Sequence, residues 1–155
     1  MTGFRRGARL GIDVGKARVG VARSDPDGLL ATPVETVARD ERAVARVMEL
    51  AAEYSAVELV VGLPLNLRGD STPSTDDAKA FAGELARASA VPVRLVDERL
   101  TTVSAHAVLR DSGRSQRSSR SIVDQAAAVV LLQHALDVEK RQGRPPGTPV
   151  PQEPA

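Results

Sequence analysis

The 155-residue chain has no cysteine and only two histidines, His106 and His134. Without cysteine, the chain can form neither a disulfide scaffold nor a thiolate zinc site. The two histidines lie far apart in the sequence, which argues against a histidine-rich metal site. A metal site in this protein would therefore use oxygen ligands, which Mg²⁺ and Mn²⁺ prefer.

Aromatic residues make up only 2% of the chain, and tryptophan is absent. Proteins that stack the bases of single-stranded nucleic acid usually present more aromatic side chains than this. The formal net charge of +1 is also too balanced to indicate nucleic-acid binding by itself. Any nucleic acid would then be recognised through its phosphates and its shape.

No run of about eighteen apolar residues is present, so we expect no membrane span. The N-terminal residues, MTGFRRGARL, lack the apolar segment of a secretory signal, and we expect a cytoplasmic protein. With 42% hydrophobic residues, the chain suits one compact domain. We expect a basic extension over 1–8, the folded domain over 9–140 and a disordered proline-rich tail over 141–155.

The beginning of the domain predicts an antiparallel meander of three strands. Apolar side chains alternate with other residues over 9–14, and a glycine turn leads to a returning strand over 19–23. A third strand is expected over 29–37, where Pro33 permits only an edge or irregular position.

The rest of the domain alternates helices with short apolar strands. Strands are expected over 57–61 and 91–96, and helices around Val44 to Ala51, after a capping box of Ser74 and Asp77, from about 103 to 110, and over 122–140. The glycine-, serine- and arginine-rich segment 112–121 is interpreted as a mobile loop. This order predicts an α/β fold with a mixed five-stranded sheet and helices on both faces.

Three carboxylates come from separate elements of this layout. Asp13 lies inside the first strand, Glu98 lies just past a central strand, and Asp124 lies in the first turn of the last helix. Carboxylates gather where a divalent cation offsets their repulsion, and two such ions about 4 Å apart can promote phosphodiester hydrolysis. Asp13 would alternatively bond the amides of the following turn.

The other two carboxylates also have local alternatives. Glu98 would form an ion pair with Arg99 or Arg94. Asp124 would interact favourably with the dipole of the last helix, with Ser121 as its N-cap. The spacing of the three acids alone does not decide between these local roles and one metal site that all three acids share.

Four separated motifs, spread from about Arg9 to Leu136, carry a family resemblance. They are LGIDVGKARVGVARSD from Leu10, VVGLPLNLRGD from Val60, VDERLTTVSA from Val96 and VDQAAAVVLLQ from Val123. Together they resemble the YqgF family, also called RuvX or Holliday-junction-resolvase-like proteins. Family members commonly have an aromatic residue and then Gly-Thr-Lys-Arg where this chain has VGKAR from Val14, so the turn stays basic.

The resemblance implies a ribonuclease H-like fold and a metal-dependent endonuclease acting on structured nucleic acid. It implies that Asp13, Glu98 and Asp124 bind Mg²⁺ or Mn²⁺ and carry the catalysis. Six basic residues would hold substrate phosphates, with a solvated surface charge as the equal alternative for each: Lys16, Arg18, Arg110, Arg114, Arg117 and Arg120.

The expected function is processing of the 5′ end of pre-16S rRNA. The alternatives are a Holliday junction resolvase acting as a dimer and a non-catalytic nucleic-acid-binding module. The expected partners are structured RNA or a four-way DNA junction, and the ribosomal particle is a further candidate partner. The chain itself is expected to be a monomer or a weak homodimer.

Overall fold

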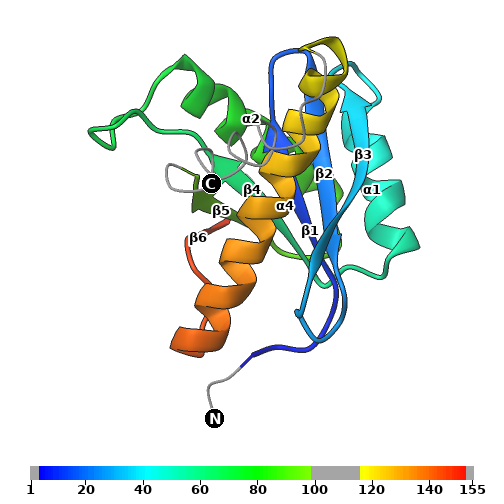
Figure 1. The fold of residues 1–155 in the computed structure, drawn as a ribbon, viewed down its shortest axis with the longest axis vertical. Coiled ribbons are helices and arrows are strands. Elements are labelled where there is room, and N and C mark those ends of the chain that lie inside the picture. Colours follow the sequence, from blue (N-terminus) through cyan, green and yellow to red (C-terminus); the bar gives the residue numbers. More distant parts are fainter. Residues whose placement is uncertain (1–3, 99–115, 153–155) are drawn as a thin grey trace.

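The computed structural model describes residues 4–98 and 116–152, arranged as one mixed sheet covered by helices (Figure 1). The elements are β1 (Arg9–Val14), β2 (Arg18–Ser24), β3 (Ala31–Ala38), α1 (Ala43–Glu53), β4 (Glu58–Leu63), α2 (Pro73–Ala88), β5 (Val93–Asp97), α4 (Gln116–Gln142) and β6 (Thr148–Val150). The helix expected over about 103–110 lies outside the described residues. No helix within the described ranges has the length and apolar character that a membrane span requires.

The sheet has the strand order β3-β2-β1-β4-β5-β6. Strands β1, β2 and β3 form the expected antiparallel meander, while β4 pairs in parallel with both β1 and β5. Strand β3 lies at an edge, as Pro33 predicts, and the register of β2 and β3 shifts opposite this proline. The mixed α/β sheet and its ribonuclease H-like topology are therefore confirmed.

The sheet has six strands, and the prediction of five was wrong. The sixth strand, β6, comes from the proline-rich segment that was expected to be disordered, and it pairs antiparallel with β5. Pro149 is tolerated because β6 is an edge strand, which needs backbone donors on one side only. Gly147 has a φ of +81°, and a Cβ atom there would overlap the carbonyl of Leu95. Composition favoured disorder, but pairing with the edge of β5 orders residues 148–150.

Helices cover both faces of the sheet, as expected. Helices α1 and α2 pack on one face through Val47, Leu50, Phe81 and Leu85, where they meet Leu10 and Ile12 of β1 together with apolar residues of β2 and β4. Helix α4 packs on the other face, where its Leu131 and Leu132 meet Val60 and Val96. Because side chains alternate along a strand, Gly11 and Asp13 of β1 belong to the α4 face.

Two helix starts differ from the predictions. Helix α2 begins with a capping box formed by Thr72 and Thr75, because Pro73 favours the first helical position and places the cap at Thr72 instead of Ser74. Helix α4 begins at Gln116, so residues 116–121 are helical although a loop was expected. Arginine and glutamine are good helix formers, and extending an existing helix needs no new nucleation.

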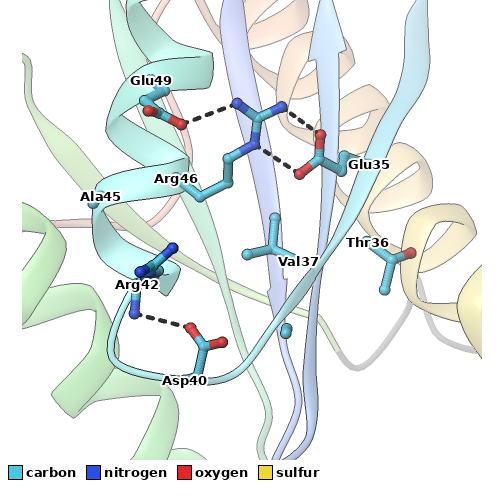
Figure 2. Close-up of a pocket in the computed structure, with 9 residues that line it drawn as sticks. Glu35, Thr36, Val37, Asp40, Arg42, Ala45, Arg46 and Glu49 are labelled. Carbon is cyan, nitrogen blue, oxygen red and sulfur yellow. Dashed lines mark hydrogen bonds and ion pairs between the residues drawn. The ribbon is translucent and has the colours of Figure 1, made fainter.

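A pocket of about 530 Å³ lies between β3 and α1 (Figure 2). The guanidinium of Arg46 donates to Glu35 at 2.6 and 2.8 Å and to Glu49 at 3.0 Å. The charges that face this pocket therefore largely compensate one another. The pocket lies on the face that α1 covers, opposite the face to which Asp13 belongs.

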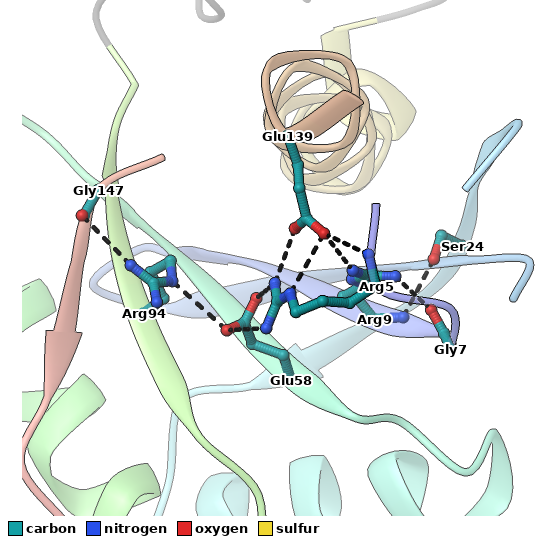
Figure 3. Close-up of polar contacts among 8 residues, drawn as sticks. All are labelled: Arg5, Gly7, Arg9, Ser24, Glu58, Arg94, Glu139 and Gly147. Atoms are coloured by element: carbon teal, nitrogen blue, oxygen red, sulfur yellow. Dashed lines mark hydrogen bonds and ion pairs between the residues drawn. The ribbon is translucent and has the colours of Figure 1, made fainter. Parts of the chain in front are cut away.

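A buried ion network joins the end of α4 to the sheet and to the N-terminal segment (Figure 3). Glu139 of α4 accepts from Arg5 at 2.7 Å and from Arg9 at 3.0 Å, and Arg5 also donates to Glu58 of β4 at 2.9 Å. The side chains of Arg9 and Glu139 are only 2% and 3% exposed. Burial alone would raise the pKa of Glu139, but the hydrogen bonds from Arg5 and the charge of Arg9 hold this pKa below its usual range.

We predict that Glu139→Gln lowers the free energy of unfolding by about 3 kcal/mol at pH 7, because it leaves the buried Arg9 without its charged partner. A carboxylate with a lowered pKa stabilises the fold above its unfolded pKa and loses this effect as the pH falls through its folded pKa. The gap between the wild type and the variant should therefore narrow in acid.

Urea denaturation at several pH values measures this gap. The matched control is Asp27→Asn, which breaks the exposed Arg6–Asp27 pair and should cost less than about 1 kcal/mol. Equal losses in the two variants would contradict the assigned role of the network.

Candidate active site

Two of the three candidate acids meet at the carboxyl edge of the parallel strands. Asp13 is the penultimate residue of β1, and Glu98 directly follows β5. The backbone N–H of Glu98 donates to the carbonyl of Leu63, the last residue of β4, at 3.2 Å. The side chains of Asp13 and Glu98 are hydrogen-bonded to each other, although they come from motifs 85 positions apart. A hydrogen bond between two carboxyl groups requires a proton on one of them.

The environment of Glu98 favours its protonated form. Burial raises the pKa of Glu98, the hydrogen bond with Asp13 opposes this rise, and the nearby charge of Asp97 adds to it. The net result is a pKa above the usual range of a glutamate. When both groups are ionised, Asp13 and Glu98 could hold a divalent cation, because carboxylate oxygens are the donors that Mg²⁺ and Mn²⁺ prefer.

Gly62 of β4 makes room for the carboxyl group of Glu98. A Cβ atom at this position would overlap Oε2 of Glu98 and would lie 3.2 Å from Cδ2 of Leu131. The Glu98 carboxyl therefore lies directly over the backbone of β4, on the face that α4 covers. This role of Gly62 was not predicted from the sequence, although an isolated glycine in a buried strand is a sign of close backbone approach.

Gly11 of β1 allows α4 to lie against the sheet. A Cβ atom at Gly11 would come within 2.8 Å of both the carbonyl oxygen of Ala128 and Cβ of Leu132. Further along the helix, Glu139 contacts Arg9, so α4 runs antiparallel to β1. The next helical turn toward the N-terminus of α4 begins at Asp124, and the next residue on this face of β1 is Asp13. The structure describes the backbone of Asp124 but not its side chain.

The local alternatives for the acids are weakened by these positions. Helix α4 begins at Gln116, so Asp124 does not lie in the first turn, where the helix dipole acts, and the expectation that it does was wrong. Arg94 donates to Glu58 and to the carbonyl of Gly147. The other proposed partner of Glu98, Arg99, lies outside the described residues.

The basic turn between β1 and β2 ends at the same edge of the sheet. Gly15 donates to the carbonyl of Arg18 at 2.8 Å, and Lys16 is exposed in this turn. Arg39 fixes the turn, because it donates to the carbonyl of Gly15 at 2.9 Å and binds Asp77 of α2 at 2.8 and 2.9 Å. The hydrogen bonds from Arg39 lower the pKa of Asp77. Its charge and that of Lys16 add to this effect, which outweighs the opposing effect of burial.

The remaining basic candidates are only partly described. Arg117 and Arg120 lie in the first turns of α4, for which the structure gives the backbone. Arg110 and Arg114 lie outside the described residues. Among the side chains that the structure places, no three acids or histidines form a group that could hold a metal, and the side chain of Asp124 is not among those placed.

Comparisons with known proteins agree on one family. The profile of the RuvX family, described as Holliday junction resolvase, matches residues 7–138. A relative from Clavibacter michiganensis subsp. michiganensis is 58% identical over 151 residues, covering 96% of this chain and 94% of its own. A relative from Streptomyces coelicolor is 56% identical over 147 residues, covering 93% and 88%. Both are provisionally named pre-16S rRNA nuclease.

A solved structure supports the fold. It is T. thermophilus RuvC in complex with Holliday junction substrate, and it superposes with a TM-score of 0.59 over 92% of this chain and 99% of its own. Its sequence is 19% identical to this chain, so the likeness concerns the fold alone.

We predict that Glu98→Gln stabilises the protein at alkaline pH in the presence of EDTA. A carboxyl group with a raised pKa stabilises the fold below its unfolded pKa and loses this effect as the pH rises through its folded pKa. A neutral glutamine does not undergo this loss. The melting temperature of the variant should exceed that of the wild type at pH 8, and the difference should vanish near pH 4.

The control for this measurement is Glu53→Gln, which changes an exposed glutamate at the end of α1. It should show no such dependence on pH. Equal melting temperatures of the wild type and Glu98→Gln at pH 8 would contradict the raised pKa of Glu98.

Proposed function

Because the chain belongs to the RuvX family, we propose that it is a nuclease that hydrolyses phosphodiester bonds in structured nucleic acid. The observation that carries this proposal is the hydrogen-bonded pair of Asp13 and Glu98 at the carboxyl edge of the sheet. Two acids from distant motifs are brought together there in a half-buried position, where a proton or a cation would offset their mutual repulsion. The names of the relatives favour pre-16S rRNA as the substrate, and the family resemblance implies its 5′ end.

The ligands that we assign to Mg²⁺ or Mn²⁺ are Asp13, Glu98 and Asp124. The register of α4 supports the third member, because Ala128 lies over Gly11 and Asp124 lies one turn closer to the strand end that carries Asp13. When bound, the cation would activate a water molecule and stabilise the leaving oxygen. The missing side chain of Gly62 leaves the space that the Glu98 carboxyl occupies, and that of Gly11 lets α4 lie against β1.

The substrate phosphates on either side of the cut would be bound by basic residues around this edge. We assign Lys16 and Arg18 to this role from the β1–β2 turn, and Arg117 and Arg120 from the start of α4. Arg110 and Arg114 are assigned to it by sequence alone. Arg39 is a positioning residue, because it holds the turn that carries Lys16 without leaving its own ion pair with Asp77.

Resolution of a four-way DNA junction is the second candidate, because the family description names it. A junction needs two symmetric cuts and therefore two active sites related by a two-fold axis. The processing of one RNA end needs a single active site. The two functions thus differ in the oligomeric state that they require.

We predict that Asp13→Asn abolishes cleavage while leaving the melting temperature in EDTA nearly unchanged. The amide keeps the size and hydrogen-bonding capacity of the carboxyl group, but it cannot supply the charge that a divalent cation needs. The assay uses a labelled pre-16S rRNA 5′ end and a labelled four-way DNA junction, each with Mg²⁺, Mn²⁺ or EDTA. Asp27→Asn, at an exposed hairpin, is the matched control and should cleave like the wild type.

The outcomes separate the candidate functions. Metal-dependent cutting of the RNA that is lost in Asp13→Asn supports a processing nuclease. Paired symmetric cuts in the junction, together with a dimer in solution, support a resolvase. A wild type that binds one of these nucleic acids but never cuts it supports a non-catalytic binding module, and a fully active Asp13→Asn contradicts the metal assignment.

A further inference from the structure

The connection between β4 and α2 carries the most exposed large apolar side chain that the structure describes. Leu67 is 96% exposed, whereas the next such residue, Leu29, is 71% exposed. Figure 1 shows this connection projecting from the body of the fold. Leu67 is followed by Arg68, which is also exposed.

Hydrogen bonds within residues 64–70, here called the β4–α2 loop, hold Leu67 out in solvent. The side-chain oxygen of Asn66 accepts from the backbone N–H groups of Arg68 at 3.0 Å and Asp70 at 2.9 Å. The backbone N–H of Asn66 donates to the carbonyl of Asp70 at 3.1 Å. Gly69 completes the turn with a φ of +86°. The hydrogen bonds of the loop thus keep the side chain of Leu67 exposed in a preorganised position.

The first residues of the β4–α2 loop are also tied to neighbouring elements. The hydroxyl of Thr75, in the capping box of α2, donates to the carbonyl of Pro64, the first residue of the loop. The carbonyl of Leu63, directly before the loop, accepts from the backbone of Glu98. The loop therefore begins directly beside the Asp13–Glu98 pair and belongs to the same edge of the sheet.

The β4–α2 loop and the basic turn between β1 and β2 can therefore contact a substrate on different sides of the acid pair. The turn carrying Lys16 follows β1, whereas the β4–α2 loop follows β4, which lies between β1 and β5. A strand cut at the acid pair must be held on both sides of the scissile phosphate. A nucleotide offers an apolar base face and a charged phosphate. It can therefore contact an apolar side chain and a neighbouring basic side chain, as in Leu67 and Arg68.

We propose that the β4–α2 loop binds the substrate strand beside the cut, with Leu67 packing against the face of an unpaired base and Arg68 contacting a phosphate. This inference rests on the proposed function and adds the element that positions the strand. A base face offers apolar area whatever its identity, so the contact tolerates many sequences. Either the RNA end or the junction can provide such a base.

The first test measures binding of the RNA end and of the junction to Leu67→Ser by fluorescence anisotropy in EDTA, where no cleavage occurs. We expect the Kd to rise about fivefold to tenfold for the substrate that the wild type cuts, because serine cannot bury the apolar area that leucine buries against a base. The matched control is Leu29→Ser, which removes an exposed leucine from the β2–β3 connection and should bind like the wild type. Both variants should keep the wild-type melting temperature, because both side chains are exposed.

The second test uses the absence of cysteine in the native chain. Leu67→Cys and Leu29→Cys each create a single thiol that can carry a benzophenone maleimide. Photolysis should join Leu67→Cys to the nucleic acid, and Leu29→Cys should give no such product. Crosslinking at position 67 without cleavage by the wild type would support nucleic-acid binding by the loop and would contradict the proposed nuclease activity.

Three outcomes would overturn the loop assignment. One is cleavage by the wild type together with an unchanged Kd in Leu67→Ser. Another is equal crosslinking from the two labelled positions. The third is a wild type that binds neither nucleic acid, which overturns the proposed function as well.

Discussion

The direct contact of α4 with the backbone of the sheet is the constraint on which the candidate site depends. Gly11 and Gly62 remove the side chains that would otherwise stand between the helix and strands β1 and β4. At Gly62 the freed space receives the carboxyl of Glu98, and at Gly11 it receives the helix backbone itself. The site thus forms where two glycines bring a helix, a strand and a strand end together.

Helix α4 is held in register at both ends of this contact. Toward its start, the side chain of Gln125 donates to Thr36 of β3 at 2.8 Å. Toward its end, Glu139 is buried among arginines, and Lys140 donates to the carbonyl of Gly28 at 2.7 Å. Polar contacts are directional, so together they fix the position of the helix along the sheet more narrowly than apolar packing alone would.

Local patterns predicted the elements well, and long-range pairings were missed. The alternation in β1, the edge position of Pro33 and the buried face of α2 are all readable from neighbouring residues. The strand β6, the buried partners of Glu139 and the role of Gly62 each depend on a residue distant in sequence. For the site, the sequence singled out Asp13 and Glu98, but their hydrogen bond required the fold. Arg39 was missed because an arginine after a strand has no local signature.

The two edges of the sheet end in strands that carry proline, namely Pro33 in β3 and Pro149 in β6. Proline has no backbone N–H, so neither edge offers a complete ladder of donors to an incoming strand. Growth of the sheet by addition of a strand from a second molecule is therefore disfavoured on both sides. Contact between two copies on a symmetric substrate would therefore be favoured through helices or loops over contact through the sheet edges.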